Sequence, residues 1–178
     1  MRKVVLKMSM SVDGFVATAS GGLEWMFPSL SEDATAWIVQ TLWQADTHIM
    51  GRATYLAMAE HWPFSAEVFA APMNQIPKVV FSKSLGKADW EESQITSGDL
   101  VEEIARLRQQ AGSDILAHGG ASFVQSLSSL GLVDEYRLIV HPVVLGSGLP
   151  LFVSRMDLTL VTTTAFSSGA VACVYRPV

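Results

Sequence analysis

The sequence of 178 residues is poor in the residues that several classes of protein require. Its single cysteine, Cys173, has no partner for an internal disulfide, and no paired cysteines suggest a zinc site. The 12 lysines and arginines are outnumbered by 17 aspartates and glutamates, and they form no basic stripe. We therefore predict no metal centre and no nucleic-acid partner, because nucleic-acid binding depends on clustered positive charge.

Long uninterrupted apolar runs are also missing. The longest apolar stretch, residues 138–153, contains a histidine, two prolines and two glycines, whereas a membrane span needs about 20 predominantly apolar residues. Lys7 and Asp13 interrupt the apolar start, so we expect no signal peptide. The expectation is a cytoplasmic protein with no membrane partner. Its 49% hydrophobic content favours a folded core over disorder.

Strand and helix patterns alternate along the chain and predict an α/β fold. We expect three-layer α/β/α architecture with a mixed, mainly parallel central sheet and a C-terminal β-hairpin, in one domain of residues 1–178. Residues 18–30 are expected to form a loop. The predicted strands are 4–10, 47–50, 78–81, 93–96, 115–117, 136–144, 158–166 and 171–176. The main predicted helices are about 32–44, 101–107 and 122–130, and a short helix is expected to begin near residues 51–55.

The most informative segment is residues 114–127, where a short apolar run ends at Gly119-Gly120. Apolar residues then recur at helical spacing from Phe123, so the glycines lie where a strand passes into a helix. The first turn of a helix offers unpaired N–H groups and the positive end of its dipole. Glycine also lets an anion approach the backbone. The segment fits a phosphate site, and it fits a tight turn without a ligand.

Two other predicted strand ends carry similar chemistry. Residues 51–54, Gly-Arg-Ala-Thr, combine a glycine, a cation and a hydroxyl, and residues 82–84, Ser-Lys-Ser, add hydroxyls and a second cation. Arginine suits phosphate because its planar fork donates two hydrogen bonds at once. Three such strand ends suggest a dinucleotide, although the chain lacks the Gly-x-Gly-x-x-Gly and Walker sequences. As an alternative, Arg52 and Lys83 are solvated surface charges.

Four segments follow one another in a recognisable order. They are Ser9 to Ala17, Ile49 to Tyr55, Val79 to Ser82, and His118 to Gly148. Their order and spacing resemble the dihydrofolate reductase-like superfamily over nearly the whole chain. Within it, the chain is similar to the C-terminal reductase domain of bifunctional riboflavin-biosynthesis enzymes. The glycine pair, with Gly-Leu-Val-Asp-Glu and Pro-Val-Val-Leu-Gly downstream, is the most specific part.

This resemblance implies an NADPH-dependent reductase, usually dimeric. It implies that Arg52 and Ser82 lie near the 2′-phosphate and that the glycine pair holds the pyrophosphate. Taken with the strand ends, the expected cofactor-binding residues are Gly51, Arg52, Thr54, Ser82, Lys83, Gly119, Gly120, Ala121 and Ser122. The residues expected to border the substrate are Ser11, Asp13, Gly14 and Trp25.

The candidate catalytic residues are Asp13 and His118. Asp13 also fits an ordinary Asp-Gly turn. Histidine is a candidate acid because its ordinary pKa is near neutral pH, but His118 also fits a hydrogen-bonded strand end. Riboflavin-pathway reductases usually have glutamate where this chain has His118, and no deaminase signature is present. The sequence position of Asp33 is near that of the acidic residue of folate reductases. Its pattern fits better with a carboxylate in the first turn of a helix, where it balances the helix dipole.

We therefore expect hydride transfer from NADPH to a small heteroaromatic or conjugated substrate, carried out by a homodimer. Two alternatives stay open. One is a non-catalytic nucleotide-binding module with the same fold. The other is a flavin-binding protein, because a basic pocket bordered by glycines also suits a flavin phosphate.

Overall fold

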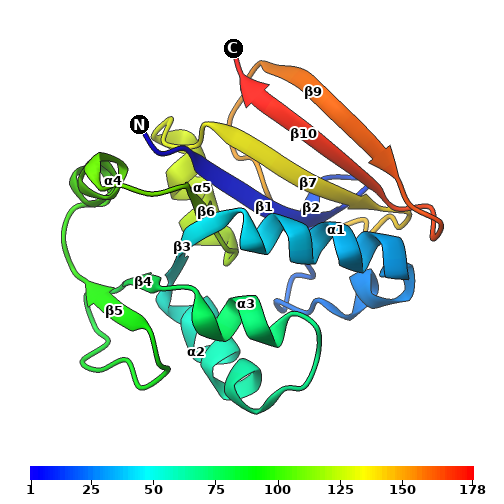
Figure 1. The fold of residues 1–178 in the computed structure, drawn as a ribbon. Helices are drawn as coiled ribbons and strands as arrows, with labels where there is room; N and C mark the ends of the chain where they lie inside the picture. The colour runs from blue at the N-terminus through cyan, green and yellow to red at the C-terminus, as the bar shows by residue number, and fades with distance from the viewer.

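The computed structural model describes all 178 residues, and a large β-sheet occupies its centre (Figure 1). The sheet contains β1 (Val4–Ser11), β3 (Ala45–Gly51), β4 (Lys78–Phe81), β5 (Ser93–Thr96), β6 (Asp114–Ala117), β7 (Glu135–His141), β9 (Leu158–Ala165) and β10 (Val171–Pro177). The strand order is β5-β4-β3-β6-β1-β7-β10-β9. The pairs from β5 to β7 are parallel, and β10 is antiparallel to both of its neighbours. Two short strands, β2 (Phe15–Ala17) and β8 (Leu149–Pro150), pair separately.

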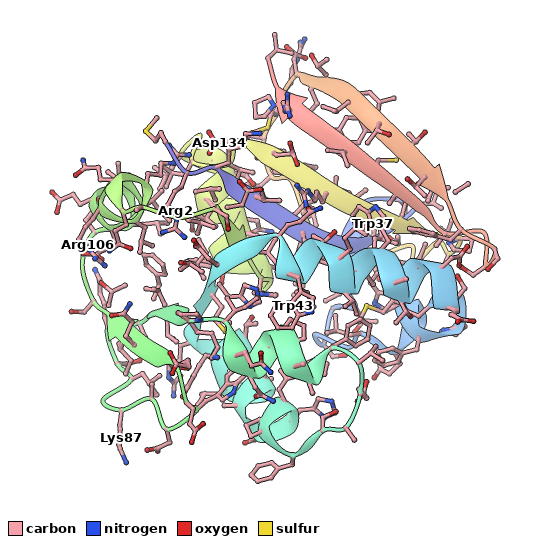
Figure 2. The ribbon with its side chains drawn as sticks, viewed as in Figure 1. Arg2, Trp37, Trp43, Lys87, Arg106 and Asp134 are labelled. Atoms are coloured by element: carbon pink, nitrogen blue, oxygen red, sulfur yellow. The ribbon has the colours of Figure 1, made fainter.

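Helices cover both faces of the sheet. They are needed on both faces because successive apolar side chains of β1 point to opposite faces. The helices are η1 (Glu24–Ser29), α1 (Glu32–Trp43), α2 (Arg52–His61), η2 (Trp62–Phe64), α3 (Ala70–Gln75), α4 (Leu100–Gln109) and α5 (Ala121–Ser129). Leu6 packs in the core beneath α4 and α5, whereas its neighbour Val5 packs in the core beneath α1 and α3. Figure 1 shows α1 in front of the sheet and α5 behind it. Trp37 extends from α1 to Phe166, with 6.2 Å between ring centroids (Figure 2).

The predicted α/β class, the mixed and mainly parallel sheet and the C-terminal hairpin are confirmed. Two local expectations were wrong, and one helix was missed. Residues 18–30 are not all loop, because η1 is a short 3₁₀ helix, which carries no α-helical period. The strand predicted to reach Val144 ends at His141, since Pro142 has no N–H for the ladder. Helix α3 was not predicted because its six residues are too few to give a clear period.

Both chain ends lie at the same side of the molecule, at the amino ends of the parallel strands (Figure 1). Val5 pairs with Glu135 at the start of β7, and Tyr175 near the C-terminus pairs with Tyr136. None of the helices combines the length and the apolar character needed to cross a membrane.

Candidate active site

The carboxyl ends of β3, β4 and β6 lie side by side at one edge of the sheet. The parallel register pairs Gly51 with Phe81 and Ile49 with Ala117. The start of α2, the turn after β4 and the glycine pair after β6 therefore meet at this edge. This is where parallel α/β sheets bind their ligands, so three predicted phosphate contacts share one site.

The glycine pair forms an open turn that leads directly into α5. Gly120 is the N-cap of α5 and has a φ of 39°, in the left-handed region that favours glycine. The N–H groups of Gly119 and Gly120 donate to no acceptor within the protein. Ala121 and Ser122 are the first two residues of the helix. The turn thus presents free donors and a helix N-terminus, both suited to an anion.

Thr54 fastens this turn to the start of α2. Its hydroxyl donates a hydrogen bond to the carbonyl of Gly119. A Cβ on Gly120 would lie 3.1 Å from the Thr54 hydroxyl oxygen, and one on Gly119 would lie 3.0 Å from the Met8 sulfur. A side chain at Gly120 would therefore crowd Thr54, and one at Gly119 would crowd Met8.

Two cations follow the neighbouring strands β3 and β4. Arg52, the first residue of α2, and Lys83, in the turn after β4, are exposed and form no ion pair. The Ser82 hydroxyl accepts a backbone N–H of that turn at 3.0 Å, so its position at the end of β4 is held. Gly51 lies against Phe123 of α5, since a Cβ at Gly51 would be 3.3 Å from the Phe123 Cβ. These contacts fit the phosphates of a dinucleotide.

Asp13 ties two loops together at the ends of β1 and β7. Its carboxylate accepts the hydroxyl of Ser11 at 2.7 Å and the N–H groups of Leu145 at 3.1 Å and Gly146 at 2.7 Å. The Ser11 bond, with the two backbone bonds, lowers the pKa of Asp13. Gly14 completes the turn with a φ of 88°. The predicted catalytic role of Asp13 stays a prediction, and the structure gives it the contacts of a loop anchor.

Trp25 lies against the end of β7. Its ring meets the ring of His141 edge-on, with 5.6 Å between centroids, and its Nε1 donates to the Gly22 carbonyl at 3.2 Å. His141 is fully buried, and its Nδ1 lies 2.6 Å from the Ser29 hydroxyl oxygen. The predicted substrate residue Trp25 therefore stands beside a buried imidazole on the face that α1 covers.

Lys7 has an unusual environment that we did not predict. It lies in the central strand β1 on the same face as Val5, which is the face of His118 and His141. Its side chain is partly buried and has no counter-ion, and this burial lowers the pKa of Lys7 to about 8. The signal in the sequence was a lysine inside an apolar run, where burial of an unpaired charge is costly.

His118 packs against a second buried histidine. Its ring centroid lies 4.6 Å from that of His48, and only 5% of His118 is exposed. Burial, with the nearby charges of His48, Lys7 and Lys78, lowers the pKa of His118 well below its ordinary value. His118 is therefore a neutral imidazole near pH 7. Its predicted role as a catalytic acid stays a prediction, and its Nε2 has no partner in the protein.

Asp33 faces the β9–β10 turn. Its carboxylate accepts the Ser31 hydroxyl, and it accepts the Ser167 N–H at 2.8 Å. These bonds, led by that from Ser31, lower the pKa of Asp33 to about 2. Asp33 lies in the first turn of α1, as expected, and it also anchors the C-terminal hairpin.

The buried histidines predict a loss of stability in acid. Burial lowers the pKa of His48 to about 4 from an ordinary 6.5, so the unfolded chain takes up protons first as the pH falls. Above pH 6.5, neutral His48 makes its full contribution to the free energy of unfolding. As the pH falls from 6.5 through 4, protonation lowers this free energy by about 3 kcal/mol. Urea unfolding across this range should show a smaller acid loss for His48→Leu than for the wild type.

The matched control is His61→Leu, because His61 lies on the surface beside Glu67. This variant should keep the wild-type dependence on pH. An equal acid loss in wild type and His48→Leu would show that His48 is not a source of the effect.

Comparison with known proteins places this geometry in a family. YyaP of Bacillus subtilis (strain 168), an uncharacterized protein, is 32% identical, and the match covers 98% of this chain and 95% of YyaP. The crystal structure of a putative riboflavin biosynthesis protein from Shewanella sp. PV-4 superposes with a TM-score of 0.81 at 20% identity, covering 99% of both chains.

A third match is to a two-part protein. The diaminohydroxyphosphoribosylaminopyrimidine deaminase/5-amino-6-(5-phosphoribosylamino)uracil reductase of Thermotoga maritima has a TM-score of 0.73 at 18% identity. The match covers 99% of this chain and 57% of that protein, so this chain has the fold of only part of it. The family model of the RibD C-terminal domain matches residues 2–172. The chain therefore belongs to the RibD C-terminal domain family.

Proposed function

We propose that residues 1–178 act as one NADPH-dependent reductase domain that reduces a small conjugated or heteroaromatic molecule. The observation that carries this proposal is the turn at Gly119 and Gly120, whose N–H groups have no acceptor in the protein. Thr54 bonds this turn to the start of α2, where Arg52 forms no ion pair. Phosphate groups need such donors and a nearby cation. Membership of a reductase-related family supports the same conclusion. The proposal includes a cytoplasmic location.

The chain's own residues would contribute binding, orientation and a proton. When bound, NADPH supplies the hydride. Lys7, whose pKa is lowered to about 8, is mostly protonated near pH 7 and can give one proton to the substrate atom beside the carbon that accepts the hydride. The resulting neutral amine regains its proton from water. Asp13 holds together the loops that follow β1 and β7 through Leu145 and Gly146.

Cofactor titration tests the proposal. Quenching of tryptophan fluorescence should report binding of NADPH, and Arg52→Ala should weaken NADPH about tenfold while NADH changes by less than about twofold. The reason is that only NADPH carries the 2′-phosphate assigned to Arg52.

Lys87→Ala is the control, because Lys87 is an exposed lysine already paired with Asp89. It should leave both affinities unchanged. Equal losses of NADPH and NADH in Arg52→Ala would refute the assignment of Arg52. If neither cofactor binds at millimolar concentration, the reductase proposal fails, and a yellow purified protein would favour the flavin alternative.

The glycine turn gives a second test. Gly120→Ala adds a methyl group 3.1 Å from the Thr54 hydroxyl oxygen at a φ of 39°. We expect a stability loss of about 1–2 kcal/mol and at least a tenfold weaker affinity for NADPH. Gly131→Ala, beyond the other end of α5, is the control. Gly131 has a φ of 65°, so alanine carries a similar backbone penalty there, but the added methyl group would meet no atom within 4 Å.

Gly131→Ala should therefore lose stability while keeping the affinity for NADPH. Thermal unfolding and fluorescence titration of both variants separate the two effects. Equal NADPH affinities in the two variants would contradict the assignment of the turn to the pyrophosphate.

We also propose that the chain forms a homodimer that covers β9. This edge strand has eight residues, contains no charge or proline, and exposes Leu160 by 52% and Val161 by 46%. Exposed edges of this kind pair or aggregate unless they are covered. Light scattering should find a dimer that Val161→Lys converts to a monomer. Val144→Lys, at an exposed position outside the large sheet, should stay dimeric, and a monomeric wild type would contradict the proposal.

A further inference from the structure

The segment between β4 and β5 carries two of the expected cofactor contacts, Ser82 and Lys83. Residues 82–92 have no regular secondary structure, so no ladder of backbone hydrogen bonds runs through them, and their position depends on separate anchors. At one end, the N–H of Ser82 donates to the Thr96 carbonyl on β5 at 3.0 Å. At the other end, the anchor is Trp90.

Trp90 is buried and contacts three other elements. Its Nε1 donates to the side-chain oxygen of Asn74 on α3 at 2.8 Å, and its backbone N–H donates to the hydroxyl of Tyr55 on α2 at 3.1 Å. The Nζ of Lys78 on β4 lies 4.4 Å from the centroid of the Trp90 ring, which is within the range of a cation–π interaction. Trp90 therefore joins the segment to α2, α3 and β4.

The partners of Trp90 are themselves held in place. Lys78 is fully buried, and its Nζ donates to three carbonyl oxygens at the end of α3 at 3.0–3.2 Å. The side-chain nitrogen of Asn74 donates to the Trp62 carbonyl at 2.9 Å. A buried polar network whose members have partners is rigid. The segment that ends at Trp90 is thus tied to a rigid part of the molecule.

A strained residue follows this anchor. Glu92 has a φ of 57°, and it is the only residue other than glycine with a positive φ. Such a conformation costs free energy and persists where the surrounding contacts impose it. The Glu92 carbonyl accepts the N–H of Lys78 at 2.6 Å, so the chain is held on both sides of the strain. Strain of this kind clusters at functional sites.

Tyr55 connects the anchor to the helix that carries the other cation. Its ring centroid lies 6.1 Å from that of Trp90, and it follows Arg52 by about one turn of α2. The segment with Lys83 and the helix with Arg52 are therefore linked through the contact between Trp90 and Tyr55. This contact fixes how the two positive charges lie relative to each other.

We propose that Trp90 is a positioning residue that sets the preference of this protein for a cofactor with a 2′-phosphate. The inference rests on the proposed reductase function. Trp90 acts through Ser82 and Lys83, whose position relative to Arg52 it fixes, rather than by contact with the phosphate. Fixing these groups before the cofactor arrives raises the affinity, because ordering a loose segment during binding costs free energy.

Calorimetric titration with NADPH and NADH tests the inference. Trp90→Leu removes the ring and the bond to Asn74, so NADPH should bind about fivefold more weakly, while the affinity for NADH changes by less than about twofold. Tyr55→Phe deletes only the oxygen that accepts the Trp90 N–H, and it should lower the preference for NADPH by about two- to threefold. In a Lys83→Ala background, Trp90→Leu should weaken NADPH by less than about twofold, because both changes remove the same phosphate contact.

Trp37→Leu is the matched control, because Trp37 is on α1 and packs against Phe166 next to the C-terminal hairpin. It removes a ring of the same size, so it should lower stability and keep the wild-type preference for NADPH. Thermal unfolding shows which variants are folded. A preference that survives Trp90→Leu, or that survives Tyr55→Phe where Trp90→Leu is unfolded, would overturn the inference. Additive losses in the Lys83→Ala background would also overturn it.

The two proposals fail in different ways. If the wild type prefers NADPH and this preference survives Trp90→Leu, the role of Trp90 is refuted and the reductase proposal stands. A wild type that binds NADPH and NADH with equal affinity also refutes the role of Trp90. If neither cofactor binds, the reductase proposal fails, and the inference fails with it.

Discussion

The parallel register of β1 between β6 and β7 is the constraint on which the site depends. It brings the carboxyl ends of the neighbouring strands to one edge, and it sets which face each side chain of β1 takes. A slip of one residue would exchange Leu6 and Lys7. Leucine would then face the histidines, and the lysine charge would enter the core beneath α4 and α5. The register of β1 thus fixes which side chains face the histidines as well as how the core packs.

The glycine turn and its cations could be predicted because their chemistry is local. Gly119 and Gly120 interrupt a strand and start a helix within a few residues, which the sequence reveals directly. The partners of Asp13 could not be predicted in this way, since Leu145 and Gly146 lie 132 and 133 residues further along the chain. The environment of Lys7 could not be predicted because its neighbours lie on other strands of the sheet.

Buried imidazoles give this member of the family its own electrostatic character. Riboflavin-pathway reductases usually carry a glutamate where this chain has His118, so a negative group is replaced by a neutral one. His48, His118 and His141 each have one buried ring nitrogen without a hydrogen-bond partner, which reduces stability because buried polar atoms are normally hydrogen-bonded.

The reversed direction of β10 has a consequence for how the chain can be joined to others. Because β10 runs back along β7, both chain ends emerge at the edge of the sheet opposite the glycine turn. A fused domain, an affinity tag or an attachment to a solid support at either end leaves the entrance to the site clear.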